Sequence, residues 1–197
     1  MSIETIKWIN SSARIIDQTK LPRKFEYIFC RDTQRMWHAI KRLEVRGAPA
    51  IGVAAAFGVL LGTNKFKGGD KLKFLKLFHE TCDYLATSRP TAVNLFNMLN
   101  QMRSVVSSNP NADVDALKKL LHKRAMEIFK EDQQVCRRMG DYGAGLIKSG
   151  MRCLTICNAG ALATVDYGTA LGVFYSAKRM AKKFSVYSCE TRPLLQG

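Results

Sequence analysis

Short runs of alternating apolar and polar residues open the chain. They cover Thr5 to Ile9, Ala13 to Asp17 and Phe25 to Cys30, and turn-forming residues separate them. Alternation with a period of two places the apolar side chains on one face of a strand. We therefore expect residues 1–30 to form a small antiparallel sheet, a β-cap on the part that follows.

From residue 31 the apolar positions recur every three or four residues, which is the period of an α-helix. The pattern predicts a helical bundle over residues 31–145. Its second helix is almost uniformly small and apolar, so we expect it to be buried on all sides. The expected helices run from Asp32 or Thr33 to about Leu43, from about Ala50 to Leu61, from Asp70 to Ala86, from a Thr91 cap to Val106, and from about Val114 past Cys136.

Glycines between Gly140 and Gly150 change the pattern, and we place a domain boundary there, with an amino-terminal domain over 1–145. Residues 146–197 predict a strand at 152–156, a helix from about Ala161 to Lys182 and a strand at 184–188. This order favours a parallel sheet. The expected fold is α/β: a small amino-terminal β-sheet and helical domain, then the incomplete beginning of a Rossmann-like parallel α/β domain.

Basic residues dominate the charge of the 197-residue chain, because 31 Lys and Arg against 16 Asp and Glu give a net charge of +15. Such a charge attracts phosphates on a small substrate, a nucleic acid or a membrane surface. The densest basic stretch, Lys65 to Lys76, interleaves lysines with phenylalanines, which would suit RNA. A solvated loop and the polar face of a helix explain it equally well, so nucleic acid is the partner we favour least.

Other features argue against a membrane-spanning, a secreted or a metal-binding protein. No apolar run approaches the roughly 20 residues that cross a bilayer, and the first residues lack a signal-peptide pattern. The six cysteines have no C-x-x-C spacing and the three histidines are scattered. We therefore expect a cytoplasmic protein with reduced thiols, no metal site and no membrane contact.

A cysteine at a strand end is the first candidate for chemistry. Cys157 ends the apolar run from Leu154 to Ile156, and the small residues 158–161 follow it. Ligands bind at the carboxyl edge of open parallel sheets, and amides at the start of a following helix favour a thiolate. A buried structural cysteine beside a glycine turn explains the same pattern, and both interpretations stay open.

Two arginines precede predicted helix starts. Arg46 stands before Gly47, Ala48 and Pro49, and proline is favoured in the first turn of a helix. Arg89 precedes a proline and so belongs to an extended segment before the next helix. A helix N-terminus beside an arginine is suited to anions. Ordinary core helices with surface arginines are the alternative, but two such arginines in one chain favour a phosphate pocket.

Four blocks of sequence carry a resemblance. They are Val45-Arg-Gly-Ala-Pro-Ala-Ile-Gly52, Ser88-Arg-Pro-Thr-Ala-Val-Asn94, Cys157-Asn-Ala-Gly-Ala-Leu-Ala-Thr164 with Tyr167-Gly-Thr-Ala-Leu-Gly172, and Glu190-Thr-Arg-Pro-Leu-Leu-Gln-Gly197. In this order they resemble the methylthioribose-1-phosphate isomerase family. Its superfamily includes ribose-1,5-bisphosphate isomerases and the regulatory subunits of translation initiation factor 2B.

The resemblance implies an aldose–ketose isomerase of methionine salvage, which converts 5-methylthioribose 1-phosphate to 5-methylthioribulose 1-phosphate without a metal or other cofactor. It implies that the phosphorylated pentose is bound by Arg46, Gly47, Ala48, Arg89 and Gln196. It makes Cys157 the catalytic cysteine, which stabilises the transition state or relays a proton. The substrate is a closed ring, so a proton donor must open it before hydrogen moves between carbons 1 and 2.

The chain also departs from that family. Ile156 replaces a histidine, which we expect to make the surroundings of the thiol drier and to oppose thiolate formation. The family's pattern continues beyond Gly197 with an aspartate proton donor and most of a dimer interface. We therefore expect little isomerase activity from this chain alone, and either a homodimer or pairing with a missing carboxyl-terminal portion. The alternative is a non-catalytic regulatory or sugar-phosphate-binding relative of the initiation factor 2B subunits.

Overall fold

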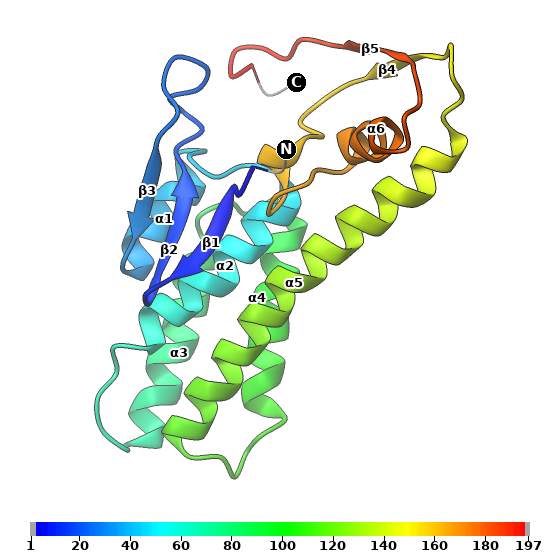
Figure 1. The fold of residues 1–197 in the computed structure, drawn as a ribbon. Coiled ribbons are helices and arrows are strands. Elements are labelled where there is room, and N and C mark those ends of the chain that lie inside the picture. Colours follow the sequence, from blue (N-terminus) through cyan, green and yellow to red (C-terminus); the bar gives the residue numbers. More distant parts are fainter. Residues whose placement is uncertain (1–2, 196–197) are drawn as a thin grey trace.

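The computed structural model describes residues 3–195 and begins with a small antiparallel sheet (Figure 1). Strands β1 (Ile6–Ile9), β2 (Ser12–Ile16) and β3 (Tyr27–Cys30) lie in that order, with Ile6 opposite Ile15 and Ala13 opposite Cys30. These four side chains are fully buried. The predicted sheet is therefore confirmed, and its apolar face closes one side of the core.

The helices pack around one central helix, α2. The set comprises α1 (Thr33–Lys41), α2 (Ala48–Thr63), α3 (Lys71–Ala86), α4 (Val93–Ser107) and α5 (Val114–Leu146). Helix α2 contacts the other four helices and the strands β1 and β2, which is why it is apolar on every side. The prediction of a buried second helix is confirmed. The predicted Thr91 cap is wrong, since Ala92 is the residue before α4.

Helix α5 continues through the glycines that were expected to change the pattern. It is 33 residues long, and its last turns run diagonally away from the bundle beneath α6 (Ala170–Arg179). A side chain at Gly140 would meet the backbone oxygen of Gly172 at 2.8 Å, and one at Gly143 would meet Val173 at 2.5 Å. These glycines therefore let two helices approach closely instead of ending one. The division at 145/146 stays a prediction.

A short parallel sheet forms the last part of the chain. Strand β4 (Arg152–Thr155) pairs with β5 (Ser185–Ser188), with Arg152 opposite Ser185. The fold is thus mixed α/β, with an antiparallel sheet, several helices and a two-stranded parallel sheet. No helix within residues 3–195 is both long enough and apolar enough to cross a bilayer.

The predicted helix from Ala161 to Lys182 is wrong in its first half. Residues Ala161–Ala163 form a single 3-10 turn, η1, and α6 begins only at Ala170. The Thr164 hydroxyl accepts the Gly168 amide at 2.8 Å, and Gly168 has φ +89°. A threonine side chain that bonds the backbone locally competes with helix formation. Residues 159–169 are therefore an irregular turn.

This turn is seated on the amino-terminal part of the chain. The Thr5 hydroxyl donates to the Ala161 carbonyl at 2.8 Å, and the Gln18 amide donates to the Leu162 carbonyl at 2.8 Å. Gly47 has φ +98°, and a Cβ there would lie 2.4 Å from both Cα and O of Ala163. The start of α2 and the turn can meet only because Gly47 has no side chain.

A pair of substitutions tests this close approach. Gly68 has φ +99° but open space around it, so Gly68→Ala meets only the backbone penalty of about 1–2 kcal/mol. Gly47→Ala meets the same penalty and a backbone clash, which overpacking data place at about 1–3 kcal/mol more. Urea unfolding should show the larger loss for Gly47→Ala. Equal losses at the two positions would contradict the contact.

Candidate anion and thiol site

A cavity of about 560 Å³ lies where the starts of α2, α4 and α6 meet the segment after β4. Five of the six residues predicted from the sequence line it: Arg46, Gly47, Ala48, Arg89 and Cys157. The sixth, Gln196, lies outside the described residues. The remaining lining residues are Pro49, Ile51, Thr91, Ala92, Val93, Asn94, Asn158, Ala163 and Thr169.

The helix starts at this cavity differ from the others in the bundle. Helices α1, α3 and α5 start away from it, and the carboxylates of Asp32, Asp70 and Asp113 cap them. Within residues 3–195, the starts of α2, α4 and α6 have no side-chain cap. Their first amides carry partial positive charge and lack intrahelical acceptors. At α6 the Ala159 carbonyl accepts the amides of Thr169 and Leu171, at 2.9 and 3.2 Å. The helix starts that offer free amides to the cavity are therefore those of α2 and α4.

Arg46 brings a full positive charge to the cavity. Its side chain is only 4% exposed, and Nε and Nη2 donate to the side-chain and backbone oxygens of Gln18 at 3.2 and 3.0 Å. Burial lowers the pKa of Arg46, but a guanidinium stays protonated. No carboxylate of the described residues pairs with it. A buried charge without a counter-charge is costly, and an anion in the cavity would offset that cost.

Arg89 approaches from another segment. It lies between α3 and α4, outside either helix as expected for a residue before proline, and is half-buried. Its guanidinium forms neither a hydrogen bond nor an ion pair with any residue in the described range. No Asp or Glu from that range lines the cavity. The lining therefore carries two arginines and no acid.

Cys157 supplies a thiol to the lining of the cavity. It follows β4, is exposed, and has φ +71°, a conformation rare for a residue with a side chain. Together with Asn158 it also lines a second cavity of about 240 Å³. Its exposure contradicts the interpretation as a buried structural cysteine. Cys30, Cys82 and Cys136 fit that description, since burial raises the pKa of each to about 12.

The expected dry surroundings of Cys157 are not found. Ile156 is 70% exposed, because the segment after β4 projects it away from the core. The thiol was also expected to face the start of a helix directly after it. The turn 159–169 separates Cys157 from α6, and only Thr169, the residue before α6, reaches the cavity.

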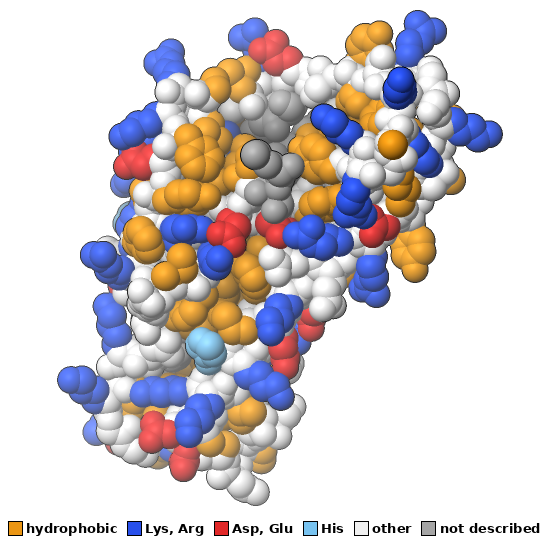
Figure 2. Space-filling model, in the orientation of Figure 1, with side chains coloured by type: hydrophobic (Ala, Val, Ile, Leu, Met, Phe, Trp, Pro, Cys, Tyr) orange, Lys and Arg blue, Asp and Glu red, His pale blue; other side chains and the backbone are white. Residues whose placement is uncertain are grey.

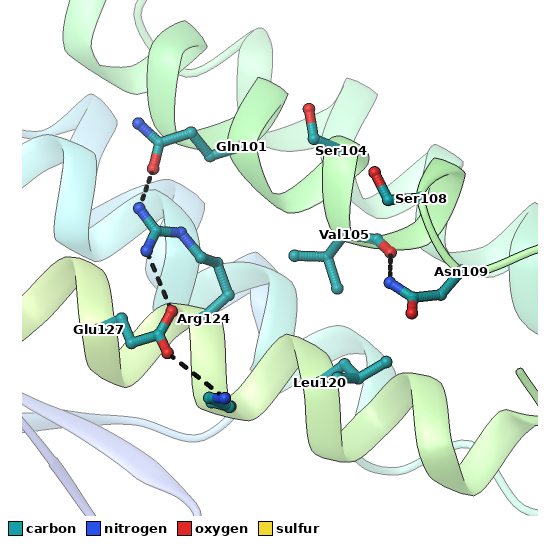
Figure 3. A pocket seen from close by; sticks show the side chains of 9 residues that line it. Gln101, Ser104, Val105, Ser108, Asn109, Leu120, Arg124 and Glu127 are labelled. Atoms are coloured by element: carbon teal, nitrogen blue, oxygen red, sulfur yellow. Dashed lines mark hydrogen bonds and ion pairs between the residues drawn. The ribbon is translucent and has the colours of Figure 1, made fainter.

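The groove between α4 and α5 offers a comparison for the charge of the cavity that Arg46 lines. This groove, of about 420 Å³, also contains an arginine, the half-buried Arg124 (Figure 3). Arg124 donates to Gln101 at 2.6 Å and pairs with Glu127 and Glu131 at 3.1 and 2.8 Å. Its charge is neutralised within the protein, whereas that of Arg46 is not.

The basic stretch from Lys65 to Lys76 does not stand out as a separate patch. Figure 2 shows lysines and arginines spread over the whole of the visible face. Lys71 bonds the Pro110 carbonyl, and Lys73 and Lys76 pair with Asp70 and Glu80. These local partners favour the solvated helix face. RNA binding stays an untested hypothesis.

The comparisons with known proteins agree on one family. The Initiation factor 2 subunit family matches residues 44–197. A methylthioribose-1-phosphate isomerase of Thermotoga maritima is 48% identical over 197 residues, all of this chain and 56% of its own length. Two crystal structures are similar as well. The 5-methylthioribose 1-phosphate isomerase of Pyrococcus horikoshii has a TM-score of 0.93 at 38% identity, over 98% of this chain and 54% of its own.

The other structure is a translation initiation factor eIF-2B delta subunit from A. fulgidus, with a TM-score of 0.88 at 42% identity, over 99% of this chain and 56% of its own. The chain thus spans about half the length of the relatives it matches. Since the family match covers most of the chain and includes every residue of the cavity, the chain belongs to the initiation factor 2 subunit family.

Proposed function

We propose that this chain is the substrate-binding part of an aldose–ketose isomerase that acts on 5-methylthioribose 1-phosphate in the cytoplasm. The observation that carries the proposal is the buried guanidinium of Arg46, unneutralised and beside uncapped helix starts in a cavity that also holds Cys157. The names of the relatives above support the choice of a phosphorylated pentose over other anions. All six cysteines, which lie within residues 3–195, are free thiols, in keeping with a reducing compartment.

A phosphate group fits the chemistry of this cavity. It carries up to two negative charges and accepts hydrogen bonds from several directions, which matches two guanidinium groups and the amides at the starts of α2 and α4. Arg46 would hold it from the buried side, and Arg89, which is half-buried, would close on it from the other. Gly47 and Ala48 offer backbone without bulk, so the phosphate can approach the start of α2.

Cys157 is the candidate catalytic residue. Product and substrate are isomers, so the reaction needs no net gain or loss of hydrogen. The ring oxygen gains a proton as the ring opens, the hydroxyl on carbon 2 loses one as it becomes a carbonyl, and a hydrogen moves from carbon 2 to carbon 1. A thiol on the cavity wall can stabilise the developing charge or relay one of these protons. Among the described residues no carboxylate lines the cavity as a second acid. We propose that this acid comes from outside the chain.

A second function has a specific observation in its favour. The A. fulgidus protein, 42% identical, bears the name of an initiation factor subunit, and the lack of a carboxylate in the cavity lining is compatible with binding alone. In this alternative the chain binds a sugar phosphate or nucleotide through Arg46 and Arg89 and does not transform it. Binding with no turnover, under conditions in which a full-length relative is active, would favour this function.

The first prediction from the proposed function concerns the affinity for the phosphorylated substrate. Replacing Arg46 or Arg89 by methionine removes charged hydrogen bonds, each worth about 1.5–3 kcal/mol, so each variant should bind 5-methylthioribose 1-phosphate about ten- to hundredfold more weakly. Isothermal titration calorimetry measures the affinity. Arg23→Met is the matched control, because Arg23 is exposed and away from the cavity. Equal affinities in all four proteins would contradict the phosphate site.

The second prediction concerns the thiol. Loss of one general acid typically slows catalysis by about 10²–10⁴-fold, so the chain alone should form the ketose at least that much more slowly than a full-length relative. Cys157→Ala should abolish this residual rate, followed by phosphorus NMR at high protein concentration. Cys153→Ala is the control, since Cys153 lies in β4 and does not line the cavity. Unchanged turnover in Cys157→Ala would remove the proposed role.

The third prediction concerns the open parallel sheet. A two-stranded sheet is marginal alone, and β4 and β5 expose Leu154, Val186 and Tyr187 by 73, 41 and 57%. Leu154 and Tyr187 are cross-strand partners on one face, and Val186 lies on the other, so both faces are open. We propose that the edge of this sheet pairs with a second copy or with a polypeptide that supplies further strands. Light scattering should therefore show a dimer or larger species, and Tyr187→Lys on the exposed strand should shift it toward monomer. A monodisperse monomer at high concentration would contradict the pairing between copies.

A further inference from the structure

We infer that Gln18 is a positioning residue, which fixes the orientation of the Arg46 guanidinium and connects it to the turn that follows Cys157. The inference rests on the proposed function of the cavity and deepens it. Gln18 is not part of the four sequence blocks that indicated a function, and it does not line the cavity. It is 1% exposed and lies two residues beyond the end of β2.

Every polar group of Gln18 is engaged. Its backbone amide donates to the Glu44 carbonyl at 3.0 Å, and its backbone carbonyl accepts from Arg46 Nη2 at 3.0 Å. The side-chain oxygen accepts from Arg46 Nε at 3.2 Å, and the side-chain nitrogen donates to the Leu162 carbonyl at 2.8 Å. Gln18 therefore accepts two hydrogen bonds from one edge of the guanidinium, that of Nε and Nη2, and bonds the η1 turn at the same time.

The choice of a neutral amide has a chemical consequence. Other arginines of the chain that are held in place, such as Arg35, Arg124 and Arg137, are held by carboxylates, which cancel their charge. Gln18 orients Arg46 without cancelling its charge. Arg46 Nη1 makes no hydrogen bond with any residue between 3 and 195, so it is left for a ligand. A glutamate could accept from Arg46 but could not donate to Leu162.

The same amide connects the two walls of the cavity. Leu162 precedes Ala163, whose backbone touches Gly47, and the turn containing both begins just after Cys157. Loss of the Gln18 side-chain hydrogen bonds would free both the Arg46 guanidinium and the turn 159–169. A preorganised guanidinium binds an anion more tightly than a free one, because its ordering does not have to accompany binding.

The experiment compares Gln18→Glu and Gln18→Met, with sulfate as the probe because it stays a dianion between pH 5 and pH 8. Gln18→Met should weaken sulfate binding about tenfold at every pH. Gln18→Glu should weaken it more than Gln18→Met does over this whole range, because the new carboxylate pairs with Arg46, which keeps it ionised and cancels the charge of the guanidinium. A purely structural role would make Gln18→Glu, which keeps the size and shape of the side chain, the milder change.

Gln133→Met is the matched control. Gln133 also supports this turn, through a 2.9 Å hydrogen bond to Asp166, but does not touch Arg46. It should leave the affinity for sulfate within about twofold, a change of about 0.4 kcal/mol. If Gln133→Met weakens sulfate binding as much as Gln18→Met, then general support of the turn explains the effect and the inference is overturned.

A measurement without ligand tests the positioning role of Gln18 independently of the proposed function. The Arg46 Nε proton should exchange slowly with water in the unsubstituted protein and at least about tenfold faster in Gln18→Met, as followed by nitrogen-15 NMR. Unchanged exchange would overturn the positioning role even if sulfate binds. If the unsubstituted protein binds neither sulfate nor 5-methylthioribose 1-phosphate, the proposed function fails, while the exchange rates still decide whether Gln18 holds Arg46.

Discussion

The whole site depends on one close approach between backbones. Gly47 at the start of α2 lies so near Ala163 that a single added carbon would overlap it at 2.4 Å. This contact brings the turn after Cys157 onto the bundle, and hydrogen bonds from Thr5 and Gln18 hold it there. The amino-terminal sheet therefore contributes to the site, because Thr5 directly precedes β1 and Gln18 lies just after β2.

The arrangement concentrates unsatisfied polar groups in one place. Elsewhere the bundle caps α1, α3 and α5 with aspartates and pairs arginines such as Arg35 and Arg124 with carboxylates. At the cavity it does neither, and it buries Arg46 to 4% exposure without a counter-charge. Each of these choices lowers stability by the ordinary rules for helix caps and buried ions. Their coincidence at a single cavity is what indicates an anionic ligand.

The sequence predicted the parts that depend on local pattern. The uniformly apolar α2 with Pro49 near its start follows from periodicity. The common site of Arg46, Arg89 and Cys157 was expected from the family resemblance, and the three residues do line one cavity. The break before α6 was missed because small apolar residues hid the bond between Thr164 and Gly168. Gln18 was missed for another reason: a lone glutamine after a strand carries no pattern, and its partners lie 28 and 144 residues away.

Binding and catalysis are separable in this chain. Among residues 3–195, the groups that line the cavity come from segments before residue 170, and these segments pack into one core or rest directly on it. The thiol projects from the end of β4, beside a two-stranded sheet whose strands expose most of their side chains. An anion site needs only a rigid cradle, whereas proton transfer also needs a second acid and exclusion of water. The proposed cradle combines the starts of α2 and α4 with the turn that rests on them, so affinity for the phosphate should survive in conditions where turnover does not.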